Sequence, residues 1–87
     1  MNRIPVSFTL DNLGDAADLY RGNIAEPRPQ GSNYALETGV PALLALYQRY
    51  RLPFTYFVEG WSANHYPDLV RRMHADGAEI GMHGWQH

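Results

Sequence analysis

The segment GMHGWQH at the end of the sequence contains two imidazoles, His83 and His87, four residues apart. Neutral imidazoles are usual ligands of zinc and similar divalent ions, and a catalytic site of this kind typically adds a carboxylate. The spacing alone is weakly specific, because the pair lacks the glutamate of H-E-x-x-H and nearby glycines disfavour a helix. On spacing alone, the pair is either a metal site or two incidental side chains at a frayed terminus.

Acidic residues at the ends of predicted strands could complete such a site. Apolar segments typical of strands cover residues 4–10, 54–59 and 78–83. Asp11, Glu59 and His83 fall at or just after the ends of these strands. Parallel strands about 4.8 Å apart would bring the three side chains together at the carboxyl-terminal edge of the sheet, the mouth of the site. Each carboxylate has a simpler interpretation: Asp11 is a common turn residue, and Glu59 could be a solvated strand end.

The elements that must position these residues alternate between strand and helix. Helices are predicted over residues 38–52 and about 64–76, and a short one is possible within GDAADLY. Pro53 should end the first long helix, and Gly77 should close the second in a left-handed conformation. The order β, loop or helix, α, β, α, β implies an α/β fold with parallel strands and right-handed crossovers.

The two faces of the predicted strands differ in character. A doubly wound sheet needs apolar residues on both faces, whereas one small, polar face with functional groups at the strand ends is typical of a barrel. The sequence therefore favours a barrel-like arrangement. The other face is large and apolar and is expected to lie under the helices. It comprises Val6, Phe8, Leu10, Phe54, Tyr56, Val58, Ala78, Ile80 and Met82.

Length and composition set limits on function. Eighty-seven residues allow one domain at most, and a net charge of −2 provides no basic face for nucleic acid. The absence of cysteine excludes thiolate metal sites, and the longest apolar run, residues 40–47, is too short to span a membrane. The first residues lack the pattern of a signal peptide, so the expected location is cytoplasmic.

The run from Thr55 to His87 resembles the polysaccharide deacetylase family, also known as carbohydrate esterase family 4 or the NodB homology domain. The segment GAEIGMHGWQH is similar to that family's G-x-E-I-x-x-H-[ST/G]-x-x-H motif, and SFTLDNLGD is similar to its T-F-D-D-G motif. The resemblance implies a distorted (β/α)7 TIM-like barrel that hydrolyses an N-acetyl or related amide with a divalent metal, zinc by default. It also implies that His83 and His87 bind the metal and that Asp11 is the general base.

The sequence departs from the family pattern at position 12. The second aspartate of the first motif, a metal ligand in the family, is Asn12 here. An amide is a weaker ligand than a carboxylate, so Asp15 or Glu59 is expected to replace it as a metal ligand, or the metal binds poorly.

The family's later motifs are absent, so residues 1–87 are expected to be the N-terminal portion of a deacetylase domain that ends after the H-x-x-x-H motif. Such a chain is expected to be inactive alone and to self-associate through open sheet edges. Three functions remain open: a deacetylase of an N-acylated sugar, an allantoinase-like hydrolase of a small amide or ureide, and a non-catalytic fragment or binding module.

Overall fold

Three parallel strands form a single sheet. The computed structural model describes residues 3–87, so the first two residues of the expected domain lie outside it. β1 (Thr9–Leu10) pairs with β2 (Thr55–Val58), and β2 pairs with β3 (Glu79–Met82), both in parallel. The sheet order β1-β2-β3 follows the order of the strands along the chain. The predicted α/β alternation with parallel strands is therefore present in the structure.

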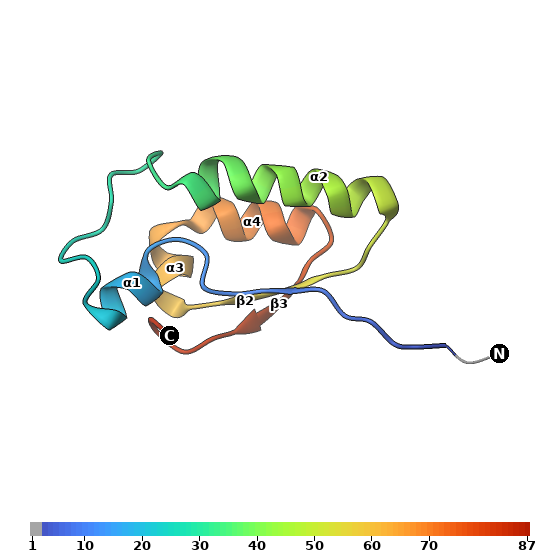
Figure 1. Cartoon of the computed structure of the whole chain (residues 1–87), viewed down its shortest axis with the longest axis horizontal. Helices are drawn as coiled ribbons and strands as arrows, with labels where there is room; N and C mark the ends of the chain where they lie inside the picture. Colours follow the sequence, from blue (N-terminus) through green and yellow to red (C-terminus); the bar gives the residue numbers. More distant parts are fainter. Residues whose placement is uncertain (1–2) are drawn as a thin grey trace.

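β1 is shorter than the predicted strand over residues 4–10. Its first residue, Thr9, lies opposite Thr55, where β2 begins, and the Thr55 N–H donates to the carbonyl of Phe8. Residues 3–7 have no strand beside them in the described part of the chain, and Pro5 has no N–H to donate. Ile4 and Val6 are accordingly exposed, and the segment extends away from the body of the molecule (Figure 1).

The helices follow the predicted pattern with two differences. α1 (Ala16–Arg21) is the short helix predicted within GDAADLY. A turn of π-helix, η1 (Ala35–Gly39), leads directly into α2 (Val40–Tyr50), so this helix begins before position 38.

The second predicted helix, over about residues 64–76, corresponds to α4 (Pro67–Ala75). A separate short helix, α3 (Gly60–His65), precedes it and was not predicted. Proline disfavours a helical conformation in the preceding residue, and Tyr66 has φ −123° and ψ 60°. Gly77 has a φ of 96°, as expected for the residue that closes α4.

The helices α2 and α4 lie side by side over one face of the sheet, while α1 and α3 lie near the carboxyl ends of the strands (Figure 1). Leu44 and Tyr47 of α2 and Met73 of α4 pack with Tyr56 and Val58 of β2 in one buried cluster. No helix within residues 3–87 is long and apolar enough to cross a membrane.

The predicted apolar face of the sheet is only partly buried. Tyr56 and Val58 are buried beneath the two helices, but Val6 and Met82 remain exposed. β2 is the central strand, whereas β1 and β3 each pair with one neighbour within the described chain, so their ends receive less cover. The prediction that Val6 and Met82 lie beneath helices is therefore wrong for this arrangement.

Candidate functional site

Four of the residues singled out in the sequence come together where the strands end. Asp11 and Asn12 follow β1, and His83 follows β3. Asp11 Oδ2 lies 3.9 Å from His83 Nε2, and Asn12 Oδ1 lies 3.1 Å from His87 Nδ1. The two imidazole rings are 5.4 Å apart between centroids. Parallel pairing thus unites two motifs that are separated by most of the chain.

The turn after β1 directs Asn12 toward His87. Asn12 has a φ of 52°, in the left-handed region that asparagine and aspartate tolerate better than other residues with side chains. Its amide oxygen accepts a hydrogen bond from His87 Nδ1. This backbone geometry suits asparagine and aspartate equally, so it does not explain why position 12 carries an amide instead of a carboxylate.

The segment after β3 is attached to the start of α3. The Gly60 N–H donates to the carbonyl of Gly84 at 2.8 Å, and the Trp61 N–H donates to the carbonyl of Trp85 at 2.9 Å. A Cβ on Gly60 would lie 2.7 Å from the Trp85 ring, so glycine permits this close approach. These contacts hold the turn that carries His87 to the mouth of the site. Neither interaction was predicted from the sequence.

Two further residues flank His87, and both come from the last turn of α1. The Arg21 Nη2 lies 3.5 Å from His87 Nε2, and the Tyr20 ring lies 5.7 Å from the His87 ring between centroids. A guanidinium can only donate, so Nε2 accepts and the ring proton lies on Nδ1, which faces Asn12. The sequence carried no signal for this contact, because Arg21 and His87 are 66 positions apart.

The donor types at this mouth fit a divalent ion such as zinc. His83 Nε2 is buried and has no hydrogen-bond partner within the described chain. A ligating histidine usually donates its other ring N–H to an oxygen, as His87 does to Asn12. Among residues 3–87, however, no three His, Cys, Asp or Glu side chains are close enough to form a ready site. The arrangement therefore provides two imidazoles and leaves the identity of a third ligand open.

Asp15 interacts with a different part of the chain. Its carboxylate is buried, accepts the Arg28 N–H at 2.8 Å and the Asn33 Nδ2–H at 2.9 Å, and pairs with the Arg28 guanidinium. These contacts hold the loop over residues 28–33 against the start of α1. The structure gives no support to Asp15 as a metal ligand, because both of its oxygens are engaged by this loop.

Glu59 has an environment that its sequence position does not reveal. It follows β2 directly, is 0% exposed, and neither carboxylate oxygen has a hydrogen-bond partner in the described part of the chain. The interpretation of Glu59 as a solvated strand end is therefore wrong. Burial raises the pKa of the nearby Tyr56 hydroxyl well above its usual range, and the charge of Glu59 raises it further. A role for Glu59 as a metal ligand stays a prediction.

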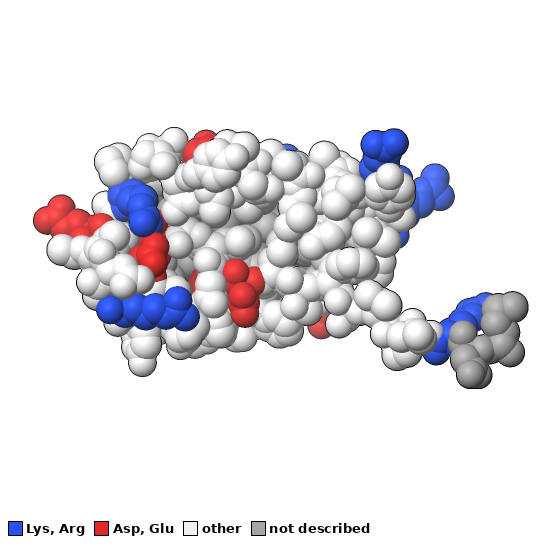
Figure 2. Space-filling view, viewed as in Figure 1, with Lys and Arg blue, Asp and Glu red and all other residues white. Residues whose placement is uncertain are grey.

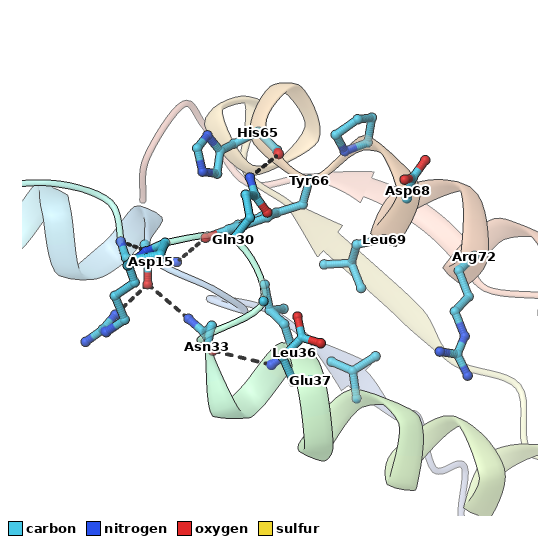
Figure 3. Close-up of a pocket in the computed structure, with 15 residues that line it drawn as sticks. Asp15, Gln30, Asn33, Leu36, Glu37, His65, Tyr66, Asp68, Leu69 and Arg72 are labelled. Atoms are coloured by element: carbon cyan, nitrogen blue, oxygen red, sulfur yellow. Dashed lines mark hydrogen bonds and ion pairs between the residues drawn. The ribbon is translucent and has the colours of Figure 1, made fainter.

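A separate pocket of about 460 Å³ lies beside the Asp15 cluster (Figure 3). It is bounded by the loop over residues 28–33, the start of the η1–α2 helix and the junction between α3 and α4. The Tyr66 hydroxyl at its edge accepts a hydrogen bond from the Asp15 N–H at 3.2 Å. Burial, reinforced by the charge of Asp15, raises the pKa of Tyr66 to about 12. No pattern in the sequence indicated this pocket.

Comparison with known proteins identifies the family of this chain. The family model for polysaccharide deacetylase matches residues 29–87, which is more than half of the chain. The chain therefore belongs to the polysaccharide deacetylase family.

One similar protein is the peptidoglycan deacetylase of Helicobacter pylori, which is 37% identical over 54 residues, covering 62% of this chain and 18% of that protein. A crystal structure from Mycobacterium smegmatis, assigned as a polysaccharide deacetylase, matches with a TM-score of 0.72 and 28% identity. That match covers 93% of this chain and 29% of the other.

These matches confirm the predicted fold class. The three parallel strands and their helices correspond to part of a TIM-like deacetylase structure. The chain spans less than a third of the length of each of these two relatives.

Proposed function

We propose that this chain provides the metal-binding and proton-accepting side chains of a metal-dependent deacetylase that acts on an N-acylated carbohydrate. The observation that carries the proposal is the convergence of Asp11, Asn12, His83 and His87 at the carboxyl ends of β1 and β3. Membership of the polysaccharide deacetylase family supports a carbohydrate substrate, and the name of the Helicobacter pylori relative supports an N-acetylated one.

His83 and His87 are the proposed ligands of a divalent ion, for which we favour zinc. The unpartnered His83 Nε2 supports this role, as does the tautomer of His87, which leaves Nε2 without a proton, so that an ion can take its lone pair in place of Arg21. Asn12 fits the role of the oxygen that orients His87 through Nδ1. The ion, when bound, would polarise the acyl oxygen and lower the pKa of a water molecule.

Asp11 is the proposed general base. Its side chain is 57% exposed, so a water molecule can reach it, and Oδ2 lies on the side of His83. The proton from the attacking water would move to this oxygen as the carbon–nitrogen bond is hydrolysed. A general base in this position typically contributes about 10²- to 10⁴-fold to the rate.

A divalent ion at this site would also need a carboxylate to balance its charge. Asn12 supplies a neutral oxygen, and Asp15 is engaged elsewhere. Glu59 is the remaining candidate, because it comes one residue after the pair Val58–Met82 and its oxygens have no partner in the described chain. Its burial supports a role in balancing positive charge, since a buried carboxylate without compensation is costly.

Zinc binding provides the direct test. Calorimetric titration of the metal-free protein should show binding that is lost in the double variant His83→Ala, His87→Ala. His74→Ala serves as a matched control, because His74 is exposed on α4 outside this site. Acetate release from N-acetylglucosamine oligomers, measured on the zinc-loaded protein, tests the reaction. Equal zinc affinity in the double variant and the control would refute the metal site.

A further inference from the structure

Arg21 places a positive charge at the mouth of the proposed site. It belongs to the last turn of α1, and Gly22, with a φ of 74°, ends the helix immediately after it. The helix is fixed to the body of the molecule by the buried residues Ala16 and Ala17. Its guanidinium therefore approaches His87 from an anchored element, at 3.5 Å between Nη2 and Nε2.

Arg21 forms no ion pair within the described chain, although, after the hydrogen bonds from Asn23 and Arg28, its charge helps to lower the pKa of Asp18. Three other arginines, Arg28, Arg71 and Arg72, form ion pairs with aspartates, but Arg21 forms none with any acidic residue among positions 3–87. Its one polar side-chain contact among residues 3–87 is with the His87 ring. Figure 2 shows arginine and acidic side chains close together at the end of the molecule that carries α1. Asp18 offsets part of the charge of Arg21, but no acidic residue among positions 3–87 accepts a hydrogen bond from it, so its remaining N–H donors can bind an anion from solution.

The neutral amide at position 12 also favours the binding of an anion beside Arg21. A carboxylate there would lie beside His87 and oppose the charge of Arg21, whereas Asn12 contributes no charge. His87 Nε2 cannot give the same lone pair to an ion and to an Arg21 N–H. An ion bound to that nitrogen would therefore leave the guanidinium free to reach a ligand.

We infer that Arg21 recognises an anionic group, a carboxylate or a phosphate, on the N-acylated substrate next to the bond that is hydrolysed. The inference rests on the proposed function and narrows it to anionic amides. A guanidinium presents five donors in a planar fork that matches either anion, and here one donor contacts His87. The Tyr20 ring, 5.7 Å from the His87 ring, provides an aromatic surface beside this position.

The kinetic test compares three sugars that differ in charge. The probes are N-acetylglucosamine, N-acetylmuramic acid, which adds a carboxylate, and N-acetylglucosamine 6-phosphate. We expect kcat/KM of the zinc-loaded protein to favour one anionic probe by about tenfold, the effect of one charge-assisted hydrogen bond. The preferred probe identifies carboxylate or phosphate as the recognised group. Equal values for all three probes would overturn the inference.

Variants separate recognition from positioning. Arg21→Gln should remove the preference through an increase in KM for the anionic probe, and Arg21→Lys should restore part of it. Arg49→Gln removes one charge from α2 and should keep the full preference. An equal loss of kcat on neutral and anionic probes in Arg21→Gln would show that Arg21 only orients His87, which contradicts the inference.

A binding measurement keeps the inference testable even if no probe is hydrolysed. The arginine Nε–H signals of the ¹⁵N-labelled protein can be followed during titration with each sugar at low salt. Arg21→Gln identifies the signal of Arg21. A saturable shift of that signal with an anionic sugar, and none with N-acetylglucosamine, supports anion recognition independently of catalysis. An unchanged Arg21 signal with both anionic sugars would overturn it, whereas equal zinc affinity in the His83→Ala, His87→Ala double variant and its control would count against the proposed function.

Discussion

Restoring a carboxylate at position 12 should tighten zinc binding. In Asn12→Asp the new side chain has nearly the same shape, and aspartate tolerates the φ of 52° at this position about as well as asparagine. The carboxylate would lie where Asn12 Oδ1 now accepts from His87 Nδ1 at 3.1 Å. It would make the imidazole a more basic ligand, or bind the ion directly.

The size of the effect follows from the position of the charge. Opposite unit charges about 4 Å apart attract by roughly 4 kcal/mol near a protein surface. Desolvation of the new carboxylate and repulsion from the neighbouring Asp11 reduce this gain, and Asp11 is itself 57% exposed. We therefore expect a net gain of about 1.5–3 kcal/mol, which corresponds to about ten- to a hundredfold in the zinc dissociation constant.

Competition with a chromophoric chelator at fixed pH and ionic strength measures this change. Asn64→Asp is the matched control, because Asn64 is exposed on α3 and the substitution adds the same charge. Glu59→Gln should be measured in parallel. An unchanged affinity in Asn12→Asp together with a large loss in Glu59→Gln would show that Glu59 already supplies the carboxylate. No change in either variant would refute the reasoning for both residues.

Two further predictions concern the surroundings of the site. Gly60→Ala should weaken zinc binding by about tenfold, because its Cβ would lie 2.7 Å from the Trp85 ring and displace the turn that carries His87. In the control Gly39→Ala the Cβ meets open space, so equal zinc affinity in the two variants would contradict this. The free energy of unfolding should fall between pH 10 and about 12, because the pKa of Tyr66 is raised from 10.0 to about 12 and only the unfolded chain loses this proton in that window. Tyr66→Phe should remove that part of the decrease in urea titrations, and an identical decrease in the variant would contradict the assignment.

Much of the fold could be predicted because its signals are local. Apolar periodicity indicated the strands and helices, and Gly77 closed a helix as expected. The break at Tyr66 was missed although Pro67 signalled it, because the apolar periodicity continued across the proline. The short β1 could not be predicted, since its length depends on where β2 begins opposite it.

The candidate site was partly predictable for the same reason. His83 and His87 share one motif, and Asp11 and Asn12 share another, so their residue types and spacing are written in the sequence. Parallel pairing then brings the two motifs to one edge of the sheet. The sequence by itself thus determined the α/β order and the side chains that meet at the mouth.

Tertiary structure alone decided how the remaining polar groups are used. Asp15 lies close to Asn12 in sequence, yet its carboxylate is held by Arg28 and Asn33. Glu59 directly follows a strand, yet it is fully buried. Arg21 lies beside His87 although 66 positions separate them. Burial and charge pairing depend on which distant segments pack together, and no local pattern of residues indicates those contacts.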